Sequence, residues 1–213
     1  MSPGPTRAAL QAATGAIHER LHGLPALAAL AAGRLDRAGY AALLRRFLGF
    51  HRGAEATLAR APDLAPWGIH LAERRRAWLI EADLATLGAA AGGAGSVPGL
   101  APLPVLDSAA RALGCLYVTE GSTLGGRQLA RALDGLLPPG EAGRRFLLGH
   151  GARHAVLWRE CCAALERCGA DPGRRAAMLE GAAGTFAAFA AWFEAPGPGA
   201  PGPEAQGMAQ GML

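Results

Sequence analysis

The chain has 213 residues and a net charge of +4, with 51% apolar and only 18% charged residues. Its apolar residues include 50 Ala and 31 Leu, but Val and Ile together number only seven. Helices favour Ala, Leu and Arg, whereas strands favour β-branched and aromatic residues. The composition therefore excludes most β-rich folds and predicts a single all-helical domain.

All 21 basic residues are Arg and none is Lys. With abundant Ala, Gly and Pro, this bias is typical of genomic base composition, so we expect no nucleic-acid partner. The four Cys form no C-x-x-C pair, which argues against a disulfide framework or a thiolate zinc site. No apolar run reaches the ~18 residues of a membrane span, and the N-terminus lacks a signal-peptide pattern. We expect a cytoplasmic protein without a membrane partner.

Helix signals begin near the N-terminus. Apolar residues at helical spacing predict a first helix over 6–21, with Thr6 as its N-cap. Asp36 is typical of a second N-cap and predicts a long helix that ends before Pro62. Each segment carries an apolar stripe on one face, as helices that pack on a core do.

The middle of the chain adds two more helices around a long loop. A third helix is expected over 70–87, and the arginine run at 74–76 most simply lies on its solvated face. Five glycines and three prolines within 88–104 indicate a surface loop. Asp107 then predicts the N-cap of a helix that continues towards Leu137.

Two or three further helices are expected over 141–194, which gives six to eight helices in one domain. Residues 195–213 are rich in Pro and Gly and too poor in apolar side chains to order themselves, so we expect a disordered tail. The sequence thus predicts a short N-terminal extension over 1–5, a multi-helix domain over 6–194 and this tail.

The first predicted helix contains the short motif H-E-x-x-H at His18, Glu19 and His22. On a helix the two His project from one face and can chelate zinc, with the Glu as general base. A zinc peptidase also needs a third ligand and a β-sheet wall, and strand-forming residues are scarce here, so we expect no stoichiometric zinc. One buried and one partly exposed His is the simpler interpretation. In a third interpretation, His18 alone is an axial ligand of heme iron.

Three glycines interrupt the helical pattern of Leu113 to Leu133 within six positions: Gly121, Gly125 and Gly126. Each costs a helix ~1 kcal/mol relative to Ala, which this composition supplies freely. Either they allow close packing between helices, or they kink the helix so that its backbone lies directly against a flat ligand. Their spacing matches neither a dinucleotide-binding fingerprint nor a P-loop.

Two segments in combination resemble the heme oxygenases, especially the bacterial type associated with phytochrome chromophore synthesis. Residues 10–18 (LQAATGAIH) are similar to the family's proximal segment, with the His at the iron-ligating position. Residues 117–126 (YVTEGSTLGG) are similar to its glycine-rich distal helix over the heme. Weaker similarity at 33–40 and from Leu157 into the final helix extends the resemblance over roughly 7–194.

The resemblance implies an all-helical single domain in which heme lies between the first helix and a glycine-kinked distal helix. It implies O2- and reductant-dependent cleavage of heme to biliverdin, carbon monoxide and ferrous iron, with heme b as both cofactor and substrate. Electrons would come from a separate reductase or ferredoxin, since the sequence shows no flavin or nucleotide motif. A bacteriophytochrome would be one recipient of the biliverdin.

The resemblance also implies a set of site residues. His18 is the implied axial ligand of the heme iron. The implied catalytic segment is Gly121, Ser122, Gly125 and Gly126, and the further implied heme contacts are Tyr117, Arg159 and Arg153. Two positions depart from mammalian members: His22 stands where they have an acid, and Ser122 where they have a water-organising Asp. Because Lys is absent, any heme carboxylate must be held by Arg, Tyr or backbone.

Three alternatives stay open. The altered distal residues suit a non-catalytic heme-binding or sensor protein of the same fold. A thiaminase-like helical enzyme would use Cys115 as its nucleophile, although apolar neighbours favour an inert core thiol there. The third is the zinc hydrolase of the H-E-x-x-H motif. Among the remaining polar pairs, His150 and His154 are interpreted as structural, and His51 and Glu55 as a surface or supporting contact.

Overall fold

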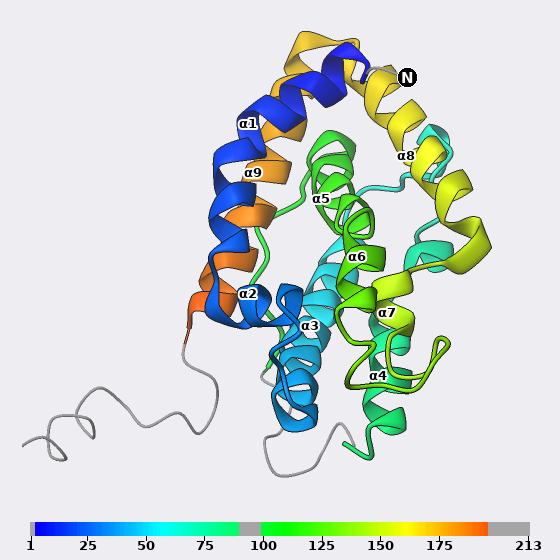
Figure 1. The fold of residues 1–213 in the computed structure, drawn as a ribbon. Helices are drawn as coiled ribbons and strands as arrows, with labels where there is room; N and C mark the ends of the chain where they lie inside the picture. The colour runs from blue at the N-terminus through cyan, green and yellow to red at the C-terminus, as the bar shows by residue number, and fades with distance from the viewer. Residues whose placement is uncertain (1–2, 90–98, 196–213) are drawn as a thin grey trace, which may run out of the picture.

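The computed structural model describes residues 3–89 and 99–195, and all regular structure in these two ranges is helical (Figure 1). The predicted all-helical fold is confirmed. The α-helices are α1 (Pro5–His22), α2 (Pro25–Ala31), α3 (Arg37–Leu58), α4 (Ala77–Thr86), α5 (Ala109–Gly121), α6 (Gly126–Arg131), α7 (Arg145–Leu148), α8 (His154–Gly169) and α9 (Pro172–Glu194). Short 3-10 helices are η1 (Ala65–Trp67), η2 (Leu71–Arg74) and η3 (Gly151–Arg153). Apart from its first residue, the tail predicted over 195–213 lies outside the described residues.

Helix α1 begins one residue earlier than predicted, and Thr6 is not its N-cap. The N-cap is Gly4, which offers no side chain to the helix end. Instead, Glu166 of α8 accepts hydrogen bonds from the backbone N–H groups of Thr6 and Arg7, both at 3.0 Å. A carboxylate at a helix N-terminus satisfies unpaired donors and complements the helix dipole. The cap comes from a distant part of the chain, so local sequence signals do not reveal it.

The predicted long second helix is confirmed as α3. Asp36 is its N-cap, and Asp36 Oδ1 accepts from the N–H of Gly39 at 2.7 Å. The inner face of α3 packs against α4 and carries the buried Tyr40. The Tyr40 hydroxyl donates to the carbonyl of Gly143 at 2.8 Å, so this buried phenol is satisfied.

The third predicted helix is wrong in its first part. Residues 71–74 form η2, the backbone is extended at Arg75, and α4 begins only at Ala77. Arg74 and Arg76 are 7% and 3% exposed, so they do not lie on a solvated face. Extended backbone places alternate side chains on opposite sides, and only the middle arginine of the run reaches solvent.

The helix predicted after the glycine-rich loop is divided in two. Its N-cap is Ser108 rather than Asp107, because Ser108 Oγ accepts from the N–H of Arg111 at 3.2 Å. Helix α5 ends at the first glycine of the glycine segment, residues 122–125 form a turn, and α6 ends well before Leu137. The predicted kink is therefore a complete break in the helix.

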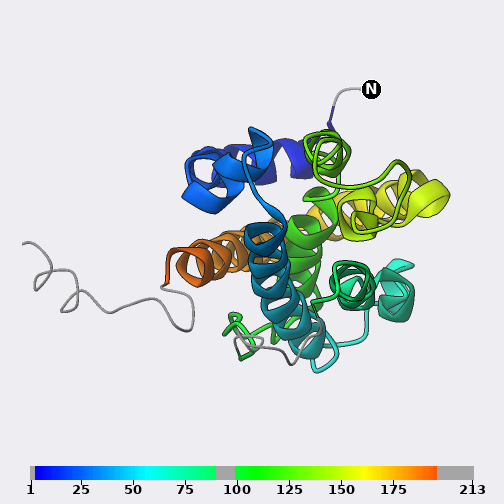
Figure 2. The same cartoon turned by 60° about the horizontal axis from the view of Figure 1, so that its bottom comes forward.

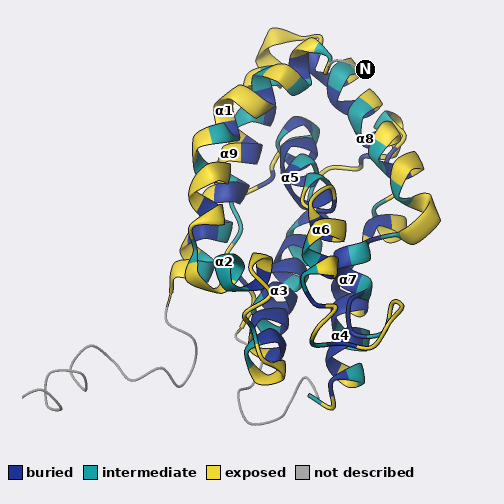
Figure 3. Ribbon diagram, in the orientation of Figure 1, coloured by how far each residue is buried: buried dark blue, intermediate teal, exposed yellow. Residues whose placement is uncertain are grey.

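Helix α5 lies in the middle of the fold, packed along α9 and flanked by α8 and α3 (Figures 1 and 2). Glycines bring α5 and α9 close together: a Cβ at Gly114 would collide with the Met178 carbonyl, and one at Gly181 with the Arg111 carbonyl. One apolar cluster surrounds α5, α8 and α9, a second lies around α3, α4 and α7, and Phe189 packs against both. Figure 3 shows α5 buried along most of its length, whereas α1 exposes its outer side.

Helix α9 is long and apolar enough, by length and composition, to cross a membrane. It is an exception to the expectation that no apolar segment reaches that length. In the fold α9 packs against α5, α1 and α8, and Met178, Thr185 and Phe186 are buried on its inner face. In this apolar stretch 33% of the residues are buried, so packing inside the domain accounts for part of its apolar character.

Candidate active site

His18 and His22 lie one turn apart on α1, and both are exposed. The expectation of one buried and one partly exposed His is therefore wrong. Their rings stand edge to face with centroids 4.8 Å apart. The His18 ring also meets Phe186 of α9 edge to face, with centroids 6.1 Å apart. The core thus supports one edge of the His18 imidazole and leaves the rest accessible to a ligand.

Glu19 forms a small cluster with these two histidines. The potential ligand atoms of His18, Glu19 and His22 all lie within 4.8 Å of one another, and all three side chains are exposed. A zinc peptidase would also need a β-sheet to bind an extended peptide, and within 3–89 and 99–195 the regular structure is helical. The cluster can hold a metal ion, but its surroundings do not fit a peptidase.

The glycines of the 121–126 segment serve two different purposes. A Cβ at Gly126 would collide with the backbone carbonyl of Leu147, so this glycine allows α6 and α7 to pack closely. A Cβ at Gly125 would meet nothing within 4 Å, and one at Gly121 would meet only the Trp158 ring, at 3.7 Å. Close packing between helices is thus confirmed at Gly126, whereas a ligand-facing backbone at Gly121 and Gly125 stays a prediction that the space beside them allows.

Two contacts connect α1 and α2 to α5 and α6, the helices before and after the turn of the glycine segment. Burial raises the pKa of Tyr117, and the nearby Thr14 side chain and Arg7 charge oppose that shift, so the phenol stays protonated. One turn further along the two helices stand Gly121 and His18. Beyond them, α2 packs against α6. Figure 1 shows α1 and α2 together on one side of α5 and α6.

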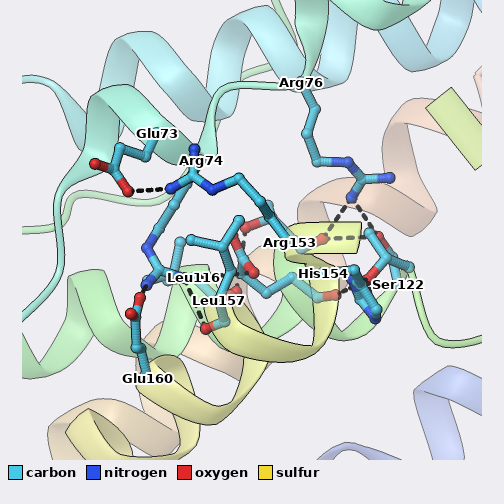
Figure 4. Close-up of polar contacts among 12 residues, drawn as sticks. Glu73, Arg74, Arg76, Leu116, Ser122, Arg153, His154, Leu157 and Glu160 are labelled. Carbon is cyan, nitrogen blue, oxygen red and sulfur yellow. Dashed lines mark hydrogen bonds and ion pairs between the residues drawn. The ribbon is translucent and has the colours of Figure 1, made fainter. Parts of the chain in front are cut away.

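Arg76 holds the C-terminal end of α5 in place (Figure 4). Its Nη1 donates to the Thr119 carbonyl at 2.8 Å and to Ser122 Oγ at 3.2 Å. Its Nη2 donates to the Phe146 carbonyl at 3.1 Å. The Ser122 hydroxyl in turn donates to the Thr119 carbonyl at 2.7 Å. Ser122 Oγ therefore keeps one acceptor position for a further donor, such as a water.

Arg76 belongs to a buried charge cluster that includes Arg74 and Glu120. Arg74 forms ion pairs with Glu120 at 3.5 Å and with Glu160 at 2.9 Å. Burial lowers the pKa of Arg76 to about 10, while Glu120 and Glu55 oppose that shift, so Arg76 stays charged at neutral pH. The sequence held one signal for this cluster: Glu120 lies inside an apolar helical pattern, and a buried acid needs a cationic partner.

His51 is buried beside this cluster, so the surface alternative for the His51 and Glu55 pair is wrong, and the supporting alternative stays a prediction. The Glu55 carboxylate instead caps α4 by accepting from the N–H groups of Arg76 and Ala77, at 2.7 and 2.9 Å. Burial and the nearby Arg76 charge hold the pKa of His51 well below its ordinary value, so the imidazole is neutral. His51 and Thr119 help to line a cavity of about 30 Å³, large enough for an ordered water.

A larger groove of about 300 Å³ runs from the glycine segment to the start of α8. Thr123, Leu124, Arg127 and His154 are among the residues that line it. Leu124 is 57% exposed and places an apolar side chain on the wall of this groove. The lining of this groove and of the smaller cavity does not include His18, so α1 contributes to neither.

The two implied arginine contacts lie in different surroundings. Arg159 is exposed on α8, three residues before Cys162, whose Sγ accepts from Arg7 of α1 at 3.4 Å. Because residues three apart share a helix face, Arg159 lies on the side of α8 that approaches α1. Arg153 instead pairs with Glu73 of η2, at 2.6 Å (Figure 4). Arg7 is a cationic side chain at the contact between α1 and α8 that the sequence did not single out.

The thiols are not nucleophiles in this structure. Cys115 is fully buried, and burial raises its pKa to about 11, so the expectation of an inert core thiol is confirmed. Cys161 and Cys168 are also buried, and Cys162 is half-buried. Cys115 therefore offers no reactive thiolate for a thiaminase-like reaction.

Comparison with known proteins places this arrangement in a family. A heme oxygenase family model matches residues 6–195. A heme oxygenase from Xanthomonas campestris pv. campestris (strain 8004) is 34% identical over 166 residues, which cover 76% of this chain and 92% of that protein.

Two solved structures share the fold. The NO- and CO-bound heme oxygenase from Neisseria meningitidis has a TM-score of 0.69 and 23% identity, covering 88% of this chain and 89% of that one. Heme oxygenase-1 from the cyanobacterium Synechocystis sp. PCC6803, in complex with heme, has a TM-score of 0.67 and 15% identity, covering 89% and 91%. The resemblance found in the sequence is confirmed, and the chain belongs to the heme oxygenase family of enzymes.

Proposed function

We propose that this chain cleaves heme b to biliverdin, carbon monoxide and ferrous iron, using O2 and electrons from a separate donor. The main support is an accessible imidazole, His18 on α1, together with helix backbone at Gly121 and Gly125 that has open space beside it. We call the region between these three residues the proposed heme slot. Membership of the heme oxygenase family supports this reaction.

The residues around the proposed heme slot fit a flat, largely apolar macrocycle. Phe186, Tyr117 and Trp158 belong to or pack against the same apolar cluster, and they come from three different helices. At Gly125 there is open space where any larger residue would place its side chain. When bound, heme supplies the iron that activates oxygen and the ring that is oxidised.

On the α1 side, His18 would hold the iron through an imidazole nitrogen. The edge contact with Phe186 limits how the ring can turn, so the imidazole is partly oriented before heme arrives. A neutral imidazole is a weaker electron donor than a thiolate and does not force cleavage of the O–O bond. His18 is therefore suited to a reaction in which the ring, rather than an external substrate, is oxidised.

On the opposite side, Ser122 would position a water beside the glycine backbone. Its hydroxyl proton is donated to Thr119, and Arg76 already fills one acceptor position, so Ser122 Oγ can only accept a hydrogen bond from that water. The water's second proton then points away from Ser122 and is free for transfer. Ser122 would thus take over the water-organising role of the mammalian Asp, with Arg76 fixing its orientation.

Heme carboxylates need cationic or hydroxyl partners at the edge of the slot. Arg159 and Tyr117 are the favoured partners, because both lie on surfaces that approach α1. Arg7 is added to them by its position beside Cys162 and Tyr117. Arg153 would serve only after leaving its ion pair with Glu73.

The reaction also requires an electron-donor protein, either a reductase or a ferredoxin. The net charge of +4 favours an acidic partner of this kind. We further propose a bacteriophytochrome as a recipient of biliverdin and a cytoplasmic location.

Loading the full chain with hemin and adding a reductant under air tests the proposal by absorption spectroscopy. Loss of the Soret band with release of biliverdin is the expected result. A stable heme spectrum under the same conditions would favour the non-catalytic heme-binding or sensor alternative. Failure to take up hemin at all would contradict both.

A further inference from the structure

Helix α1 carries a second set of metal ligands next to the proposed axial ligand. His18, Glu19 and His22 are exposed, and their ligand atoms lie within 4.8 Å of one another. Two imidazoles and one carboxylate, with the remaining positions open, form a ligand set that holds Zn²⁺ as well as non-heme Fe²⁺. We propose that in the heme-free protein these three residues bind a divalent transition-metal ion.

The helix arranges these ligands before any ion arrives. His18 and His22 are four residues apart and Glu19 and His22 three apart, so all three side chains project from neighbouring positions on one helix face. The two imidazole centroids are already 4.8 Å apart. Because the side chains are exposed, small rotations can bring the two imidazole nitrogens and the carboxylate oxygen to the ~2.0–2.2 Å from the ion at which such ligands bind. Packing of α1 against α9 and α8 keeps this face of the backbone rigid.

The charge of Glu19 is available to such an ion. Among the described residues, Glu19 takes part in no ion pair, and the adjacent Arg20 faces Glu194 at 3.8 Å. An exposed carboxylate without a cationic partner keeps its negative charge for a bound cation. Two neutral imidazoles and this carboxylate would leave a bound Fe²⁺ with one net positive charge in a solvated position.

Because His18 belongs to both sites, heme and a free ion exclude each other. The site would therefore exist only when heme is absent. A consequence that rests on the proposed function is that ferrous iron leaving the cleaved ring meets Glu19 and His22 directly beside its former ligand. This transfer is a ligand exchange, in which waters leave the ion and side-chain atoms replace them, with no change in oxidation state. Heme-loaded protein should hold no second ion, whereas ion binding by the heme-free chain would go against the expected absence of stoichiometric zinc.

The test uses the full chain, freed of heme and treated with chelator. Calorimetric titration with Co²⁺, an air-stable probe, and with Fe²⁺ under nitrogen should show one ion per chain. His22→Ala and Glu19→Gln should each weaken binding about tenfold or more, since even outer partners of metal sites cost 10–100-fold. His70→Ala removes another exposed His and should bind like the wild type. Protein preloaded with hemin should show no binding.

Unchanged affinity in His22→Ala, or equal binding by hemin-loaded protein, would overturn the inference. All three ligands are exposed, so these variants should fold normally, and circular dichroism checks this. The two proposals fail in different ways. If hemin is degraded but the heme-free chain binds neither ion, only the metal site is wrong. If the ions bind as expected but hemin is not degraded, the site stands and the proposed function is wrong.

Discussion

On the α1 side of the proposed heme slot the functional side chains are exposed, whereas on the α5–α6 side buried groups hold them. His18 touches the core through one ring edge, and its neighbours Glu19 and His22 are free in solvent. Ser122 is fixed by Arg76, which is only 3% exposed and donates to three different groups. The iron ligand can therefore be changed without disturbing the fold, but the distal geometry is inseparable from stability.

Replacing Arg76 should have the largest effect. Arg76→Met removes three hydrogen bonds and leaves the carboxylates of Glu120 and Glu55 with less positive charge nearby. Removing one partner of a buried ion pair costs about 3–5 kcal/mol. Urea unfolding should therefore show a free energy of unfolding that is lower by about 3 kcal/mol. The exposed neighbour supplies the control, because Arg75→Met should change stability by less than about 0.5 kcal/mol. Equal losses in both variants would mean that burial of the arginine does not matter.

Two adjacent glycines sharpen the same comparison. Gly126→Ala drives a Cβ into the Leu147 carbonyl, which cannot move as a flexible side chain would, and overpacking of this kind costs about 2 kcal/mol. Gly125→Ala enters open space and should leave thermal unfolding nearly unchanged while weakening hemin binding. A stability loss in Gly125→Ala with normal hemin affinity would show that the slot does not use this backbone.

The buried His51 should give stability a pH dependence. Its folded-state pKa lies well below 6.5, so below about pH 6.5 the unfolded chain takes up a proton that the folded chain does not. The neutral His51 thus contributes stability that is fully present above about pH 6.5. As the pH falls towards the folded-state pKa, the free energy of unfolding decreases by about 1.4 kcal/mol for each pH unit. The free energy of unfolding, measured with urea between about pH 6.5 and pH 5, should therefore depend less steeply on pH for His51→Gln than for the wild type. Identical slopes would place the titrating group elsewhere.

The smallest of these effects belongs to the start of α1. Glu166→Gln replaces a carboxylate that accepts from two N–H groups with an amide that can offer only one oxygen. Loss of a helix cap costs about 1 kcal/mol, so the melting temperature should fall by a few degrees. Because Glu166 contacts only backbone N–H groups at the opposite end of α1 from His18, the histidine-ligated heme spectrum should be unchanged. A spectral change on loading would instead couple this end of α1 to the site.

The fold was largely predictable from the sequence, because its strongest signals are local. Ala and Leu enrichment predicts helices, and Asp36 caps α3 as its position suggests. The failures occur where distant groups replace local ones. Glu166 caps α1 from α8, and buried acids draw Arg74 and Arg76 out of a helix into an irregular segment.

The candidate site was predictable only where glycines or a motif mark it. Gly125 stood out because Ala is plentiful in this chain, and the structure leaves its surroundings open. Sequence alone does not distinguish the role of Gly125 from that of Gly126. The two differ in how closely the backbone of α7 approaches them, which depends on the fold. Nor does the sequence connect Arg76 to Ser122, which are 46 positions apart and meet only in the folded chain.

The most direct test of the account compares the absorption spectra of hemin-loaded wild type, His18→Ala and His22→Ala. Both side chains are exposed on the same helix face, so both variants should fold equally well. The account predicts that His18→Ala loses the histidine-ligated heme spectrum and regains it with added imidazole, while His22→Ala keeps a spectrum similar to the wild type. Loss of that spectrum in His22→Ala, with His18→Ala unchanged, would contradict His18 as the iron ligand.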